Sequence, residues 1–181
     1  MNSREVYDFL LGHNLCDTWR SLLVGAESKL DFVSASLSGQ GIEFLLNRKE
    51  ITVDWIKGEF SEYLNKEVDL FDGRKGMLVA DLKGYKQISS NVDVLHFMDS
   101  IAVLKVDDWY VGEITVSRGS KIIIEVCSDV ILNINIYDDS EVNIVGTHKV
   151  KDAVVNVRCY SGICKDLLSG NNNKVFIYGS I

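Results

Sequence analysis

The chain has 181 residues, of which 46% are hydrophobic and 25% are charged, and its formal net charge is −7. This apolar content excludes a globally disordered chain, and the length suits one domain or a small domain joined to another. Nucleic acids and anionic membranes are polyanions, so the acidic balance argues against nonspecific binding to either.

The sequence also bears on compartment and on cysteine chemistry. No apolar run approaches the roughly 20 residues that cross a bilayer, and no signal-peptide core follows Arg4 and Glu5. We therefore expect a protein that is made in, and at first retained by, the cytoplasm. No CxxC spacing occurs among the cysteines, so we expect free thiols, with a disulfide from Cys159 to a neighbour left open; the four are Cys16, Cys127, Cys159 and Cys164.

Residues 1–66 predict a small bundle of short helices. Asn2 and Glu5 have the spacing of a capping box, and Ser28 with Asp31 resembles a second helix start. Thr52 precedes the clearest amphipathic stripe. Helices this short do not persist alone in water, so they must pack together as a head or cap.

From about Glu67 the period of the apolar residues changes from helical to alternating, which indicates strands with one buried face. Asp72-Gly73 is a turn signal within this region. Beyond Gly112 the alternating runs recur at nearly regular steps, with polar breaks between them. These runs begin at Ile114, Ile122, Leu132, Val142, Val155 and Val175.

Two architectures fit short strands at this spacing: a β-solenoid, and an antiparallel meander or sandwich. Dipeptides that strongly favour two-residue hairpin turns, such as Asn-Gly, are absent beyond Gly112. The outward positions of this region repeat asparagine. Both features favour the solenoid. We therefore predict an α+β chain with a helical domain at 1–66 and a β-solenoid domain at 67–181. If three strands complete a coil, two to four coils fit. So short a stack exposes open ends, which predicts self-association.

The order of these segments resembles a group of small phage and prophage proteins of gut bacteria. The residues that carry the resemblance are Ser120-Lys121-Ile122-Ile123-Ile124, Asp138-Asp139-Ser140-Glu141-Val142-Asn143-Ile144 and Val155-Asn156-Val157-Arg158-Cys159-Tyr160. Proteins of this group look like a helical head followed by a short β-solenoid. The resemblance implies that fold and a mobile-element setting, and it implies no catalytic residues.

The sequence gives little support for catalysis or metal binding. His13, His96 and His148 lie in three different contexts, without the spacing of a metal site. Four carboxylates fall near adjacent breaks and could serve acid–base chemistry only if folding brought them together; they are Asp129, Asp138, Asp139 and Glu141. We expect no cofactor, no metal and no catalytic residue.

Aromatic residues are the candidate binding residues. Tyr137, Tyr160 and Tyr178 each follow the last inward residue of a strand, and Trp109 and Tyr110 occupy a polar break. Such rings could form a surface platform for a protein, a glycan or a small molecule. Alternatively, they stack at the corners and cover the coil below.

Three functions remain open at this stage. The first is a non-enzymatic phage or prophage protein, a homo-oligomer for which we assume a trimer, that binds a partner through the solenoid surface. The second is a protein that sequesters a small molecule between subunits and neutralises a defence signal. The third is an enzyme that acts on saccharides. The first places the protein in the host cytoplasm on synthesis, with the virion as an open alternative.

Overall fold

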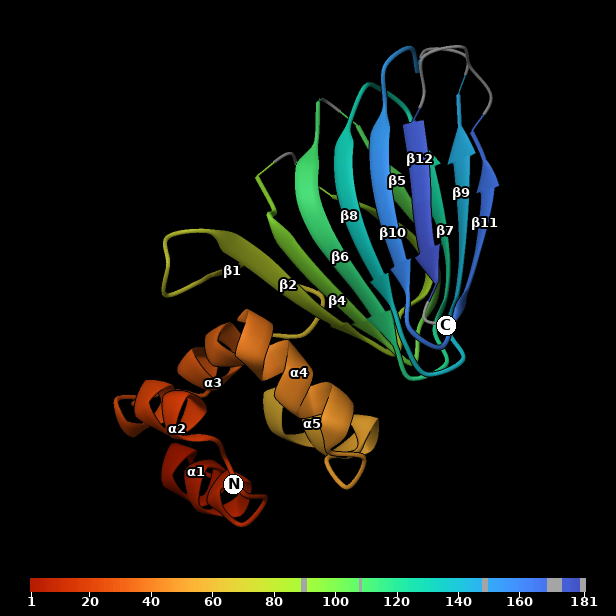
Figure 1. Cartoon of the computed structure of the whole chain (residues 1–181). Coiled ribbons are helices and arrows are strands. Elements are labelled where there is room, and N and C mark those ends of the chain that lie inside the picture. Colours follow the sequence, from red (N-terminus) through yellow and green to blue (C-terminus); the bar gives the residue numbers. More distant parts are fainter. Residues whose placement is uncertain (89–90, 108, 148–149, 169–173, 180–181) are drawn as a thin grey trace. The chain divides into compact units, whose positions relative to one another are not determined.

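The computed structural model describes residues 1–88, 91–107, 109–147, 150–168 and 174–179. The chain divides into two compact units, Met1–Leu78 and Val79–Ile181. Within the described residues, helices occupy the first part and strands the rest, which confirms the predicted α+β class (Figure 1). No helix in this part of the chain is long and apolar enough to cross a membrane.

The first unit consists of short helices that begin at the residues the sequence indicates. Asn2 and Glu5 form the predicted capping box, with hydrogen bonds of 2.9 and 2.7 Å between each side chain and the other residue's N–H. Ser28 and Asp31 form a second box, and the Thr52 side chain caps the last helix. The helices are α1 (Ser3–Leu11), α2 (Asp17–Val24), α3 (Lys29–Ser36), α4 (Gly39–Asn47) and α5 (Val53–Phe60).

The boundary between the units lies later than the sequence suggested. We expected it after residue 66, because the alternating period begins there. In the structure, β1 (Val68–Asp69) pairs antiparallel with the start of β2 (Lys75–Ala80), and this hairpin belongs mainly to the helical unit. The hairpin packs closely against the residue that ends α3, because a Cβ on Gly76 would lie 2.9 Å from Leu37 Cδ1.

The second unit is a β-solenoid of two parallel sheets. One sheet contains β4 (Val94–Met98), β6 (Val111–Ser117), β8 (Ile131–Ile136), β10 (Val154–Cys159) and β12 (Lys174–Gly179), in that order. The other contains β3 (Lys83–Gln87), β5 (Ile101–Val106), β7 (Lys121–Val126), β9 (Glu141–Gly146) and β11 (Ile163–Leu167). Consecutive strands alternate between the two sheets, which form two layers in Figure 1.

Each turn of the solenoid uses two strands, and this corrects the expectation of three. Paired residues in neighbouring turns are 18 to 23 positions apart, and the offset is 20 for Ile101 with Lys121 and for Lys121 with Glu141. The ten-residue steps in the sequence are therefore half-turns. Because each turn is shorter than expected, the described strands make about five turns rather than two to four.

The interior is the dry column of aliphatic side chains that the alternation predicted. In parallel in-register strands, every second residue stacks on its equivalent in the next turn. Leu104, Ile124 and Ile144 stack in one sheet, and Val116 and Ile136 in the other, all fully buried. Asn133 faces outward as expected, whereas Asn135 is buried and donates to Glu113 Oε1 at 3.1 Å.

Candidate binding surfaces on the solenoid

The outer face of the second sheet carries rows of side chains that run across its strands. Because the strands pair in register, outward residues of equal height line up from β3 to β11. The first row is Lys83, Ile101, Lys121, Glu141 and Ile163. The second row is Tyr85, Val103, Ile123, Asn143 and Lys165.

Apolar side chains dominate the centre of this face. Ile101 is 60% exposed, Tyr85 56% and Ile123 39%. They line a shallow groove of about 710 Å³ together with Val103 and the aliphatic stems of Lys83 and Lys121. Clustered exposed apolar residues of this kind mark interaction surfaces more often than single ones do. We call this set of rows on β3, β5, β7 and β9 the isoleucine face.

Charges flank the isoleucine face in an uneven arrangement. Lys121 Nζ lies 3.7 Å from Glu141 Oε1, and Lys83 Nζ lies 3.4 Å from Asp81 Oδ1. A third row places Lys105 of β5 beside Glu125 of β7. In the rows from β3 to β9, Lys83 and Lys105 lie on β3 and β5, whereas Glu125 and Glu141 lie on β7 and β9 together with Lys121 of β7.

A second, smaller pocket lies on the first sheet, where β6, β8 and β10 begin. Its volume is about 230 Å³, and Trp109, which is 74% exposed, forms one side of it. The remaining lining residues are Val111, Asp129, Val130, Ile131, Asp152 and Val154. We call it the Trp109 pocket.

Backbone hydrogen bonds hold one carboxylate of the Trp109 pocket in place. Asp129 Oδ1 accepts from the N–H groups of Asp152 at 2.7 Å and Lys151 at 2.8 Å. These two bonds hold the pKa of Asp129 below its usual value, so the carboxyl group stays ionised at neutral pH. The main chain at Trp109 is anchored as well, because its backbone N–H donates to Ser128 Oγ at 3.2 Å.

The tyrosines predicted as binding residues do not form one platform with Trp109. Tyr137 and Tyr160 stack with ring centroids 4.4 Å apart and planes at 4°, as the alternative of corner stacking predicted. They follow β8 and β10, whereas Trp109 precedes β6, so they lie at the opposite end of the same sheet. Tyr178 is exposed on β12, in register with Arg158.

Tyr110 is not a surface residue, which corrects the sequence interpretation. Its side chain is only 1% exposed. Tyr110 O accepts a hydrogen bond from Ile131 N–H, and Val130 O accepts the equivalent bond from Val154 N–H one turn later. Tyr110 therefore occupies the same inward position as Val130 in the next turn. Its ring packs where a Cβ on Gly112 would otherwise lie. Burial raises the pKa of the phenol.

One serine–histidine pair tests the expectation that the chain is not catalytic. His96 Nε2 lies 2.9 Å from Ser117 Oγ, and Ser117 Oγ lies 3.3 Å from Phe97 O. Burial lowers the pKa of His96 to about 3, so the ring is neutral. If the hydroxyl donates to Phe97 O, the imidazole donates to the hydroxyl, which is the reverse of nucleophile activation. We read the pair as a structural contact.

The other chemical candidates stay apart as well. Asp129 precedes β8 while Asp138 and Asp139 follow it, so the acidic residues do not converge. His13 Nδ1 lies 3.3 Å from Glu50 in the first unit, and His148 falls outside the described residues. Among the described residues, no group of three or more His, Cys, Asp or Glu side chains could hold a metal ion.

The cysteines of the described residues are free thiols. Cys159 and Cys164 lie at the end of β10 and within β11, on either side of one corner. Burial raises the pKa of Cys164 to about 12 and raises that of Cys159 above its usual value. Both therefore remain protonated at neutral pH, and a protonated thiol is a poor nucleophile.

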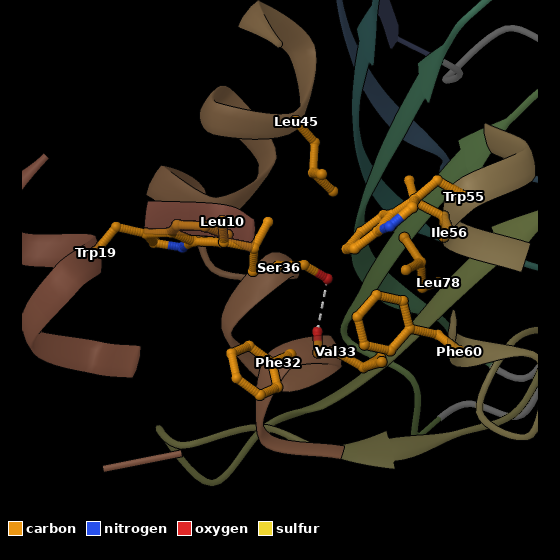
Figure 2. A pocket seen from close by; sticks show the side chains of 10 residues that line it. All are labelled: Leu10, Trp19, Phe32, Val33, Ser36, Leu45, Trp55, Ile56, Phe60 and Leu78. Carbon is orange, nitrogen blue, oxygen red and sulfur yellow. Dashed lines mark hydrogen bonds between the residues drawn. The ribbon is translucent and has the colours of Figure 1, made fainter. Parts of the chain in front are cut away.

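The helical unit contains a small internal cavity rather than a ligand site. Its volume is about 20 Å³, and apolar side chains surround it (Figure 2). The Ser36 hydroxyl, which also lines it, already donates to Val33 O at 2.8 Å. One water molecule would fit but would find too few polar partners, so we interpret the cavity as a dry packing defect.

Comparison with known proteins adds no assignment to this geometry: no family model, no curated protein and no solved structure matches the chain.

Sequence reasoning found Trp109 but missed the isoleucine face and Asp152. Lys121-Ile122-Ile123-Ile124 looks like one buried run, although Ile123 points out between two buried neighbours. Asp152 lies one full turn after Asp129, and only the length of the turn brings them together. A search for outward residues at 20-residue spacing would have found the isoleucine face, but not Asp152, because the turn from Asp129 to Asp152 is 23 residues long.

Proposed function

We propose that this chain is a non-enzymatic interaction protein that self-associates through the isoleucine face. The observation that carries the proposal is the row of exposed aliphatic residues at positions where an exposed sheet face is normally polar. A phage or prophage setting for this role is supported by the sequence resemblance alone.

A second copy of the chain is the partner that fits the charges. Two sheets can pack face to face with their strands nearly aligned, about 10 Å apart. A two-fold axis along the strands, between β5 and β7, places β3 opposite β9 of the second copy and β5 opposite β7. This operation sets Lys83 against Glu141 and Val103 against Ile123 of the second copy.

The same operation also pairs Lys105 with Glu125 of the second copy. It also sets Ile101 against Lys121, whose aliphatic stem can cover it, and Tyr85 against Asn143 of the second copy. Such self-complementarity is characteristic of a two-fold interface, in which one patch contacts itself. We therefore propose a dimer in place of the trimer assumed from the sequence.

Charge reversal at Lys83 and Glu141 tests this arrangement sharply. Two strands, β5 and β7, separate these residues within one sheet, so their pairing reports on contact between copies. Lys83→Glu alone or Glu141→Lys alone places like charges opposite each other twice per dimer and should weaken association by about tenfold. An equimolar mixture of the two variants should recover it, because the heterodimer has only opposite charges in contact.

Sedimentation equilibrium at micromolar concentrations measures the association constants of the wild type, of each variant and of the mixture. Lys66→Glu in the first unit is the charge control and should leave association unchanged. Ile123→Thr should weaken association, whereas Ile131→Thr, an exposed isoleucine of the other sheet, should not. A monomeric wild-type protein, or failure of the mixture to recover binding, would overturn the proposal.

A further inference from the structure

The Trp109 pocket combines three kinds of side chain in one small space. Val111, Ile131 and Val154 lie in register on neighbouring strands and form an apolar floor. The Trp109 indole stands beside it, and Asp129 and Asp152 supply carboxylates. This surface belongs to the other sheet from the isoleucine face, so the inference is independent of the proposed dimer.

The exposure of Trp109 needs an explanation. A large aromatic ring is normally buried, because burial removes much apolar area from water. Here the ring is mostly exposed, and the backbone adopts φ of 57°, a region that bulky residues rarely occupy. Its backbone N–H donates to Ser128 Oγ, which fixes the main chain from which the indole projects.

The charge of the pocket suits a cation. Asp129 is held in the ionised form by two backbone N–H groups, both of which bond its Oδ1 atom. Lys151 lies close enough to interact with Asp129, and Lys174 pairs with Val154 in the next turn, but neither lines the pocket. The side chains that face a ligand are therefore two carboxylates, an indole and aliphatic groups.

We propose that the Trp109 pocket receives an arginine side chain of a protein partner. A planar guanidinium group stacks on an indole face and donates in a fork that matches carboxylates. The methylene stem of the arginine would cover the apolar floor. The volume of about 230 Å³ is below the roughly 300–1,000 Å³ of pockets for whole small ligands, and it suits a single side chain.

A saccharide fits the same pocket less well. Sugars also stack on tryptophan, but their hydroxyl groups require several donors and acceptors. In the described part of the chain, the lining side chains with hydrogen-bonding oxygens are the two aspartates alone, and the floor is aliphatic. The chemistry therefore favours a ligand with an alkyl stem and a delocalised positive charge.

Titration of the ¹⁵N-labelled full chain with N-acetylarginine amide tests the proposal. The Trp109 indole N–H signal is the readout, assigned by its loss in Trp109→Asn, a change that the left-handed backbone tolerates. We expect a saturable shift of this signal. N-acetylcitrulline amide, which is neutral but nearly the same shape, should bind about fivefold more weakly, and so should N-acetyllysine amide.

Matched variants assign the interaction to the carboxylates. Asp129→Asn keeps an oxygen for the two backbone N–H groups but removes the charge, and Asp152→Asn removes the second charge. Each should weaken arginine binding about threefold or more. Asp139→Asn removes one charge at the far end of β8, at a left-handed corner that suits asparagine, and should change nothing. Equal binding of citrulline or lysine, retained affinity in both pocket variants, or a larger shift with methyl glycosides would overturn the proposal.

Discussion

Ser120 Oγ accepts a hydrogen bond of 3.1 Å from the backbone N–H of Ser100, which lies 20 residues earlier. The relation repeats in both directions: Ser140 Oγ accepts from Ser120 N–H at 3.1 Å, and Ser100 Oγ accepts from Leu82 N–H at 3.1 Å. All three serines are fully buried at equivalent corners. A ladder of hydroxyl groups thus satisfies the backbone where the chain leaves one sheet for the other.

Ser120→Ala should destabilise the solenoid measurably. The change leaves the N–H of Ser100 buried without its acceptor and also removes the 2.7 Å bond that Ser120 Oγ donates to Ser117 O. The loss should be about 1–3 kcal/mol in the free energy of unfolding, measured by urea denaturation. Ser21→Ala, on an exposed helix position, is the control and should stay within about 0.5 kcal/mol of wild type. An equal effect of the two changes would show that the ladder contributes nothing.

Several strands of the second unit, from β6 to β10, were predictable because buried apolar residues alternate with outward residues along them. The sequence did not predict β3 or β11. The turn length was not predictable either, because β7 and β8 look alike in sequence although they belong to different sheets. The signal that distinguishes them is the corner. Asp99-Ser100, Gly119-Ser120 and Asp139-Ser140 recur every 20 residues, and the residue before each serine has positive φ.

The candidate site was less predictable, because exposure depends on the neighbouring turns. Trp109 and Tyr110 are adjacent aromatic residues in one polar break, and nothing local separates them. Contacts with the next turn determine which ring is buried. Tyr110 stacks inward beside Val130, whereas the backbone N–H of Trp109 donates to Ser128 and its ring stays exposed. The pairing of turns has to be known before either assignment can be made.

Two glycines in helices of the first unit should respond to alanine in opposite ways. A Cβ on Gly41 of α4 would collide with the Ala35 carbonyl oxygen of α3, so Gly41→Ala should cost about 1–3 kcal/mol or more. A Cβ on Gly58 of α5 would meet no neighbouring atom within 4 Å, and alanine there should stabilise the unit by about 0.5–1 kcal/mol. Thermal unfolding followed by circular dichroism compares them. A stabilising Gly41→Ala would contradict the close approach of α3 and α4.

Asp31 should make the stability of the first unit fall in acid. Partial burial of the carboxyl group opposes its ionisation, but hydrogen bonds from Ser28 and Glu27 outweigh this effect and lower its pKa. A lowered pKa contributes stability that is present above the unfolded value of about 3.9 and is lost as the pH falls through the folded value. Asp31→Asn should therefore be less stable than wild type at pH 7, and the difference should shrink toward pH 3. A difference in unfolding free energy that does not change with pH would contradict this role of the charge.

Tyr137 should make the solenoid sensitive to alkali. Burial raises the pKa of its phenol, and the hydrogen bond with Tyr160 raises it further. A raised pKa contributes stability that is fully present below the unfolded value of about 10 and is lost as the pH rises through the folded value. Tyr137→Phe keeps the ring that stacks on Tyr160 but removes the ionisable group, so its unfolding free energy should fall less steeply above about pH 10. Urea denaturation at a series of alkaline pH values measures the two slopes. Equal slopes would mean that the Tyr137 phenol reaches solvent freely despite the stacked ring above it.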